Sequence, residues 1–315
     1  MYYPYLRGKQ FELILLRDNA EFLSQYNIHP IIEPVKADVK ALLRAIKNLE
    51  AYGVNYTLII NPQVGRSLEK QRVALENVLE NELKPTENLF LGYIISPSSK
   101  DRSIEKILHH YSRYQFSIVH QGFSSGQTLA DITGKFSNVK EHIFIEGKSG
   151  KLYRKHFRKD NLSRILIKDG FDKKTRNKDY PDSEHFSDLH ITYDEEGMNG
   201  FGDYLIVGDS YAATGGPAYA VAIHLTYLGA EDDMFISHFK SNRTDSPTDP
   251  AGKFLEAVEK LFTAVNISGS SIFPSKACRE FCDLYRKKHF PGLGYVKKLS
   301  MQHHIELLAY YMSKD

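Results

Sequence analysis

Short apolar runs alternate with longer segments whose apolar residues recur every three or four positions over about the first two thirds of the chain. Runs of the first kind predict buried strands, and the longer spacing predicts amphipathic helices. The run HPIIEPV (29–35), for example, precedes a segment that carries Val39, Leu42, Ile46 and Leu49 on one side. The sequence therefore predicts repeated strand–helix units.

Eight runs are predicted to be strands: YYPYL (2–6), HPIIEPV (29–35), YTLIINP (56–62), LFLGYIISP (89–97), FSIVHQG (116–122), HIFIEGK (142–148), RILIKDGF (164–171) and DYLIVGD (203–209). Their nearly unbroken apolar character is typical of parallel strands that are buried on both faces. Eight strands alternating with helices favour an α/β fold of the TIM-like (β/α)8 barrel type. An open doubly wound sheet is the alternative, but Gly8 stands alone where such a sheet carries a glycine-rich fingerprint.

The pattern changes after residue 215. The segment AYAVAIHLTYLGAEDDMFISHFKS (218–241) contains two strand-like runs around a turn at Gly229, which predicts an antiparallel hairpin. Its two histidines, His224 and His238, are expected to pack across the strands. Helices are predicted around 254–262, 276–288 and 298–312. We therefore expect a barrel over 1–215 and a hairpin with a helical cap over 216–315, packed as one compact unit because no long flexible linker separates them.

The composition is that of a globular protein, with 315 residues, 42% hydrophobic and 25% charged. No apolar run reaches the roughly 18 residues that a membrane span needs, and the start MYYPYLRGK lacks the order of a secretory signal, so a cytoplasmic location is expected. The two cysteines, Cys278 and Cys282, have a C-x3-C spacing without a second pair. This favours buried structural thiols over a zinc site.

A net charge of +2 gives no whole-protein field that would favour nucleic acid. Local charge is different, because twelve Lys or Arg residues lie between 148 and 178. Such a segment is either a solvated surface or a binding site for phosphates or a nucleic-acid backbone.

Polar residues directly follow the predicted strands, and the C-terminal strand ends form the active-site face of TIM barrels. Any one of them also fits a turn or a satisfied structural residue, as for Asn61 before a proline or for His120. As a set, they are predicted to form a site. The predicted catalytic groups are Glu33, Lys36, Glu146 and Asp169, and the predicted substrate-binding groups are Arg7, Lys9, Asn61, His120, Lys148 and Arg176.

This mixture of carboxylates and cations has a chemical meaning. A carboxylate crowded by lysines stays ionised, and a partly desolvated lysine loses its proton more readily, so either group can serve as a base or nucleophile. Alternatively, Glu33, Glu146 and Asp169 hold a divalent cation with Asn61 as a neutral ligand, although no metal motif is present. Asp203 is expected at the start of the eighth strand, opposite the site, where it would stabilise the fold.

Four short motifs stand out along the chain: the opening Tyr2-x-Pro-x-Leu-Arg-Gly-Lys9 followed by Glu12, then Pro30-Ile-Ile-Glu33, Gly202-Asp-Tyr204 and Ile223-His-Leu-Thr-Tyr227. Together they resemble the phage beta-protein family and its bacterial relatives. The resemblance implies a barrel-like α/β fold and, for bacterial relatives, a gene neighbourhood that opposes phage. It implies no particular reaction. Arg7 stands where relatives would have Lys, which keeps the charge and changes its geometry.

Two functions remain open at this stage. The first is an enzyme that acts on a small anionic substrate, phosphorylated or nucleotide-like, in a phage-related context. The alternative is a non-catalytic barrel that binds a protein or a nucleic acid in a defence module, with segment 148–178 as the contact for nucleic acid.

Overall fold

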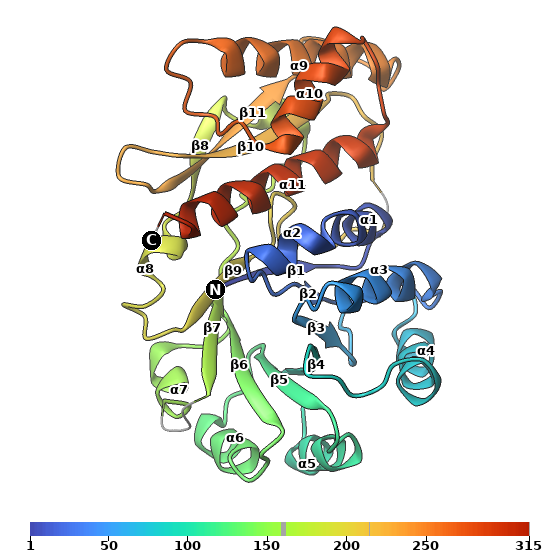
Figure 1. Cartoon of the computed structure of the whole chain (residues 1–315), viewed down its shortest axis with the longest axis vertical. Helices are drawn as coiled ribbons and strands as arrows, with labels where there is room; N and C mark the ends of the chain where they lie inside the picture. Colours follow the sequence, from blue (N-terminus) through green and yellow to red (C-terminus); the bar gives the residue numbers. More distant parts are fainter. Residues whose placement is uncertain (159–161, 214, 315) are drawn as a thin grey trace. The chain divides into compact units, whose positions relative to one another are not determined.

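The computed structural model describes residues 1–158, 162–213 and 215–314. Eight parallel strands form a closed barrel in the order β1-β2-β3-β4-β5-β6-β7-β9, as Figure 1 shows. They are β1 (Tyr2–Leu6), β2 (Ile31–Ile32), β3 (Tyr56–Ile59), β4 (Leu89–Ile95), β5 (Gln115–His120), β6 (Val139–Ile145), β7 (Ser163–Ile167) and β9 (Gly200–Asp203). This confirms the predicted TIM-like fold.

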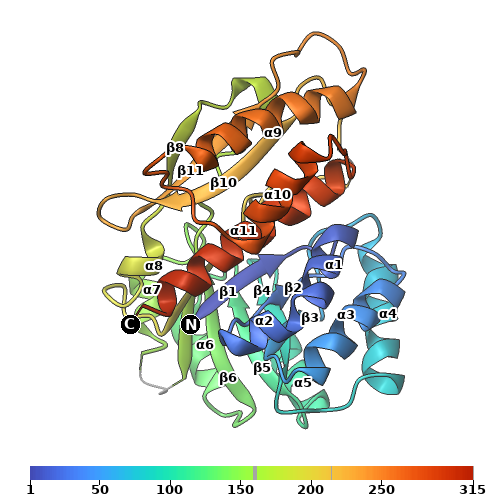
Figure 2. The same cartoon turned by 45° about the horizontal axis from the view of Figure 1, so that its top comes forward.

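Helices lie around the outside of the strand ring (Figures 1 and 2). They are α1 (Gln10–Asp18), α2 (Ala20–Gln25), α3 (Lys40–Ala51), α4 (Leu68–Asn81), α5 (Asp101–His110), α6 (Gly126–Thr133) and α7 (Lys151–Lys155). The amphipathic stretch that carries Leu13, Leu16, Ala20 and Leu23 forms two helices, α1 and α2, which meet at Asn19. The Asn19 side chain donates to the carbonyl of Leu15 at 2.8 Å, and such local bonding competes with helix continuation.

The eighth barrel strand was predicted in the wrong place, at 203–209. Strand β9 instead ends at Asp203, and Leu205 has a φ of 51°, which an extended strand does not allow. The closing strand contains Gly200 and Gly202 because it runs close to β1. A Cβ on Gly202 would overlap the carbonyl oxygen of Tyr3. Asp203 consequently stands at the C-terminal end of its strand, contrary to the prediction, and accepts a hydrogen bond from the Tyr2 hydroxyl at 2.8 Å.

The N-terminal half of the barrel interior is polar. Glu141 accepts hydrogen bonds from the hydroxyls of Tyr3 and Ser117, both at 2.8 Å. Ser117 is 3.2 Å from the Thr57 hydroxyl, which is 2.8 Å from Nε2 of His29. Because Ser117 donates to the carboxylate, Thr57 must donate to Ser117 and accept from His29. The buried Glu141 therefore ends a chain of donors that joins β1, β3, β5 and β6 across the barrel.

The chain divides into two compact units, one of residues 1–168 and 192–203 and one of residues 169–191 and 204–315. The short helix α8 (Leu189–Thr192) spans one of the boundaries. The expected packing of a cap on the barrel as one body stays a prediction. No helix of the described residues is long and apolar enough to span a membrane.

The second unit contains an antiparallel sheet in the order β10-β11-β8, with β8 (Ser183–Ser187), β10 (Ala222–Leu228) and β11 (Met234–Lys240). The predicted hairpin is confirmed, and His224 lies directly opposite His238. Strand β8 was not predicted, because its sequence SEHFS is polar and lacks the apolar run that marks the other strands. It pairs with β11, far away in the sequence.

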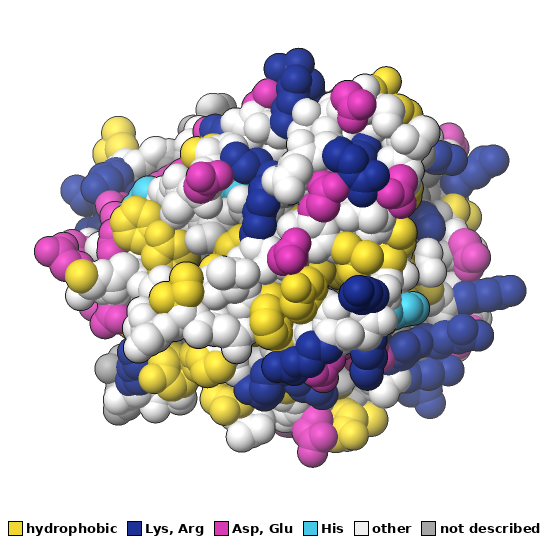
Figure 3. Space-filling view, turned by 90° about the horizontal axis from the view of Figure 1, so that it is seen from above, with side chains coloured by type: hydrophobic (Ala, Val, Ile, Leu, Met, Phe, Trp, Pro, Cys, Tyr) yellow, Lys and Arg dark blue, Asp and Glu magenta, His cyan; other side chains and the backbone are white. Residues whose placement is uncertain are grey.

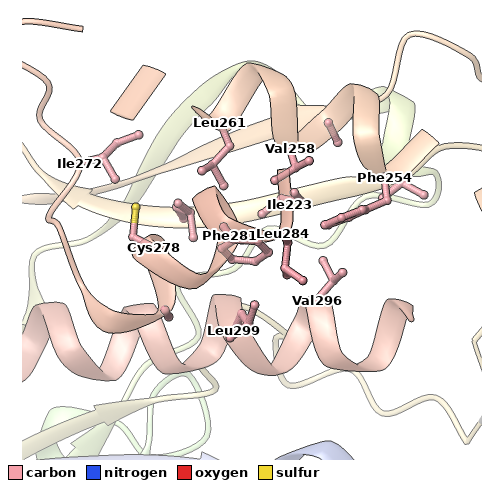
Figure 4. Packing of buried hydrophobic residues seen from close by; sticks show 14 residues of the cluster. Ile223, Phe254, Val258, Leu261, Ile272, Cys278, Phe281, Leu284, Val296 and Leu299 are labelled. Carbon is pink, nitrogen blue, oxygen red and sulfur yellow. The ribbon is translucent and has the colours of Figure 1, made fainter. Parts of the chain in front are cut away.

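Helices α9 (Pro250–Asn266), α10 (Lys276–Arg286) and α11 (Leu293–Met312) complete this unit, with a 3-10 turn η1 (Asn177–Asp179). Figure 4 shows Phe254, Phe281 and Leu299 of these helices meeting Ile223 of β10 in one apolar core. Cys278 and Cys282 are free and buried, as predicted.

His303 of α11 ties three elements of the second unit together. Its Nε2 donates to the carbonyl of Thr226 on β10 at 2.8 Å, and its Nδ1 accepts from the Ser275 hydroxyl at 2.7 Å. Ser275 also caps α10 by accepting from the amide of Cys278 at 2.9 Å. Burial lowers the pKa of His303 to about 4, so the ring is neutral at pH 7.

The close approach of β9 to β1 can be tested with Gly202→Ala. The added methyl would collide with the Tyr3 carbonyl and with Ile167, so we expect the free energy of unfolding to fall by about 2 kcal/mol or more. Gly150→Ala is the control, because nothing lies within 4 Å of its Cβ position. Urea denaturation measures both. Equal stability of the two variants would contradict the role of Gly202.

His303 should make the protein sensitive to acid. Its pKa falls from 6.5 to about 4 on folding, so between these values the unfolded chain binds a proton that the folded chain does not. The contribution of His303 to the free energy of unfolding is greatest above pH 6.5. It decreases as the pH falls toward 4, by up to about 3 kcal/mol. The variant His303→Gln should show a smaller loss between pH 7 and 4.5 in urea denaturation. An unchanged pH dependence in this variant would contradict the assignment.

Candidate functional site

The first feature of the barrel mouth is a buried ion pair between Arg7 and Glu33. Strands β1 and β2 are parallel neighbours with Leu6 opposite Ile32, so the residue after each strand end lies beside the other. The guanidinium of Arg7 contacts a carboxylate oxygen of Glu33, and both side chains are buried. These two predicted site residues are therefore brought together by strand register.

Glu33 is held by three donors and is fully buried. Besides Arg7, the Tyr5 hydroxyl donates to it at 2.8 Å and the backbone amide of Gln63 donates at 2.7 Å. The guanidinium of Arg7 in turn lies 5.0 Å from the centre of the Tyr5 ring. A carboxylate with this many donors is fixed as an acceptor, so the arrangement favours a role in positioning Arg7 over proton transfer.

A cavity of about 210 Å³ opens next to this pair. Its polar lining comes from Gly8, Gln10, Lys36 and Asp38, and its apolar lining from Leu13, Pro34, Val35, Ala41 and Leu42. The chain reaches it through a turn at Gly8, where φ is 58° and a Cβ would lie 3.2 Å from the carbonyl oxygen of Glu33. Lys36 is exposed and has no ion-pair partner among the residues that the structure describes.

Lys9 and Asn61 occupy strand ends but take part in local structure. Lys9 precedes α1, and its backbone amide donates to the Glu12 carboxylate at 3.2 Å. The Asn61 side chain donates to the carbonyl of Ile94 at 2.9 Å and accepts from the Ile94 amide at 2.8 Å. Asn61 thereby extends the pairing of β3 with β4, which favours the structural interpretation of this residue.

Glu146 and Lys148 follow β6 and are exposed. The backbone amide of Glu146 donates to the carbonyl of Ile167 at 2.8 Å and so continues the sheet. In the described part of the chain, no ion pair joins either side chain to Arg7 or Glu33. They share the C-terminal end of the barrel with that pair, since all eight strands are parallel.

His120 does not face the barrel interior. Because Ser117 points inward, alternation along β5 directs His120 outward, toward the helices. There it is 2.8 Å from the Tyr153 hydroxyl and 3.0 Å from Nδ1 of His142, and its ring packs against Phe157 of the segment after α7. Burial, with the neighbouring His142, lowers its pKa well below the ordinary value. This environment is that of a structural histidine, not of the predicted substrate-binding one.

Asp169 and Arg176 belong to the second unit and have partners within it. Asp169 accepts from the amides of Phe171 at 3.0 Å and Asp209 at 2.7 Å, which shapes a loop. Arg176 binds the carboxylate of Asp179 with two hydrogen bonds. Within the described ranges, no three His, Cys, Asp or Glu side chains are grouped closely enough to hold a metal ion. Glu33 and Glu146 belong to the first unit and Asp169 to the second, so the cation site predicted from these three residues stays a prediction.

The basic segment 148–178 is partly neutralised. Lys151 and Arg154 both pair with Glu196, at 2.8 Å and 2.7 Å. Lys174 pairs with Asp172 and Glu184. Residues 159–161 of the segment lie outside the described residues. On the face drawn in Figure 3, basic, acidic and apolar side chains are interspersed.

Comparison with known proteins gives no match to a protein-family model, to a curated protein or to a solved structure. The resemblance to the phage beta-protein family therefore stays a hypothesis carried by its motifs.

Sequence reasoning missed two residues of the mouth. Tyr5 could have been found, because alternation along β1 places Tyr3, Tyr5 and Arg7 on one side of the strand. Gln63 could not, because it binds Glu33 through its backbone amide and any residue type except proline offers that group.

The ion pair can be tested with Glu33→Gln. This variant keeps the shape but removes the charge that Arg7 contacts, and breaking a buried pair is expected to cost about 3 kcal/mol of unfolding free energy. Glu105→Gln is the matched control, since Glu105 forms an exposed pair with Lys135 at 4.0 Å and should change stability by about 0.5 kcal/mol or less. Urea denaturation of both variants gives the comparison. A loss no larger than that of the control would show that the pair does not organise the mouth.

Proposed function

We propose that the protein is an enzyme that binds a small anionic substrate at the C-terminal end of its barrel, with Lys36 as the group that contacts the anion. The observation that carries the proposal is the exposed ammonium of Lys36 on the rim of a cavity beside the buried Arg7–Glu33 pair. Among the residues that the structure describes, Lys36 has no ion-pair partner. An unpaired cation at a concave site attracts anions, and low-dielectric walls strengthen this attraction.

The size and the lining residues of the cavity restrict the kind of ligand that fits it. A cavity of about 210 Å³ is smaller than the several hundred Å³ of typical drug-sized sites, so it suits a phosphate or a small carboxylate better than a whole nucleotide. Leu13, Val35 and Leu42 supply apolar walls, while Gln10 brings the first turn of α1 to the rim. Backbone amides in a first helical turn favour negative charge.

Arg7 and Glu33 would act together as support. Glu33 fixes the guanidinium, and the pair holds the strand ends on which Gly8 and Lys36 follow. Glu146 and Lys148, at the same end of the barrel, are the proposed groups for a larger part of the substrate. The phage-related context is proposed from the sequence resemblance alone.

Thermal shift measurements with inorganic phosphate, acetate, malonate and mononucleotides test the site. A ligand that binds the folded protein should raise the melting temperature with the logarithm of its concentration. For the anion that binds best, we expect Lys36→Ala to need an at least about tenfold higher concentration for the same rise in melting temperature. This corresponds to a loss of about 1.4 kcal/mol of binding free energy.

Lys47→Ala is the control, because Lys47 is an exposed lysine of α3, the helix that follows Lys36, and does not line the cavity. Equal loss in both variants, or no response to any anion, would contradict the proposal.

The alternative function is nucleic-acid binding through segment 148–178. It is tested by charge reversal at Lys155 and Arg158, with the binding of a fluorescent oligonucleotide as the measurement.

A further inference from the structure

Three titratable side chains lie in a row on one face of the sheet in the second unit. Glu184 of β8, His238 of β11 and His224 of β10 come from adjacent strands. Nε2 of His238 is 3.1 Å from a Glu184 carboxylate oxygen, and Nδ1 of His238 is 2.6 Å from Nδ1 of His224. The three groups are thus connected by two consecutive hydrogen bonds.

The direction of these hydrogen bonds follows from the carboxylate. Glu184 is paired with Lys174 at 3.4 Å and accepts, so His238 donates from Nε2. A neutral His238 then has a bare Nδ1, which accepts from the Nδ1–H of His224. This leaves the lone pair of His224 on Nε2, and no partner for that atom is found among the described residues.

The surroundings keep both rings neutral at pH 7. The aromatic rings of Phe171 and Tyr180 pack edge-on against His224, with centroids 5.2 and 4.8 Å away. Burial lowers the pKa of both histidines. The pKa of His224 is lowered further by His238 and by Lys297 of α11, and the pKa of His238 is lowered further by Lys240 and Lys174. Glu184 is the charge that acts in the other direction, because it raises the pKa of His238.

We infer that Glu184, His238 and His224 form a proton relay whose terminal base is Nε2 of His224, and that this base takes a proton from a water or a hydroxyl-bearing ligand. When Nε2 of His224 accepts that proton, its Nδ1–H passes to Nδ1 of His238, whose Nε2–H moves toward Glu184. The positive charge is thereby shared toward the carboxylate, which makes the terminal imidazole a stronger base than an isolated buried one. His224 would touch the ligand, and the other two are positioning residues.

Long-range proton–nitrogen NMR of the full chain labelled with ¹⁵N-histidine tests the relay, with signals assigned by His224→Gln and His238→Gln. We expect the Nδ1–H tautomer for His224 and the Nε2–H tautomer for His238. In Glu184→Gln, the protonation midpoint of His224 should fall by about one pH unit. The same substitution should have little effect on His224 when His238→Gln is also present. The exposed Glu231 supplies the control, Glu231→Gln, which removes the same charge from the same unit and should leave the midpoint unchanged.

Reaction with diethyl pyrocarbonate tests whether the base is available. Acylation of His224, measured by mass spectrometry against the exposed His185, should slow at least about threefold in Glu184→Gln at constant pH, and Glu184→Asp should restore part of the rate. The proposal is overturned by an Nε2–H tautomer of His224, by a midpoint that Glu184→Gln does not move, or by the absence of His224 acylation in the wild type.

Discussion

The closed ring of parallel strands is the constraint on which the first unit depends. Closure requires β9 to lie against β1. The two backbones come so close that a Cβ at position 202 would overlap the Tyr3 carbonyl oxygen, so only glycine fits there. Once the ring closes, alternation decides which side chains enter the interior and parallel direction decides which strand ends share a face. Both the polar core and the candidate site follow from these two consequences.

Buried carboxylates are stabilised by different partners at the two ends of the barrel. In the N-terminal half, the buried Glu141 receives hydroxyl donors from Tyr3 and Ser117. At the C-terminal end, Glu33 is opposed by Arg7, and the turns that follow the pair border a cavity that is also lined by Lys36. In TIM barrels the first end generally serves stability and the second serves function. The contrast in this chain supports the same division of roles.

Much of the fold could be predicted because parallel strands that are buried on both faces leave continuous apolar runs. The exceptions have physical reasons. The closing strand GFGD is short and rich in glycine because of close approach, so the apolar run just after it was taken for the strand. Strand β8 is polar and depends on β11, a partner that is remote in sequence.

The site was predictable only in part, for related reasons. Arg7 and Glu33 were found because neighbouring parallel strands end side by side. The direction of His120 depends on its position relative to Ser117, whose hydroxyl points into the barrel. The two residues are three apart along β5, so their side chains point to opposite faces of the strand. Asp169 and Arg176 follow the seventh strand in sequence, yet they belong to the second unit, and no local pattern marks that boundary.

We propose proton chemistry and anion binding at different places in this chain. Glu33 is fully buried, and its two oxygens accept from Tyr5, Arg7 and the Gln63 amide, so the carboxylate is engaged in holding the strand ends together. His224 differs, because one nitrogen is engaged by His238 and the other has no partner in the described part of the chain. A group that exchanges protons must gain or lose one while its neighbours keep their hydrogen bonds. The two imidazoles of His224 and His238, which end on the carboxylate of Glu184, meet this requirement. Lys36 suits the proposed binding role, since its side chain is exposed and has no ion-pair partner to give up among the described residues.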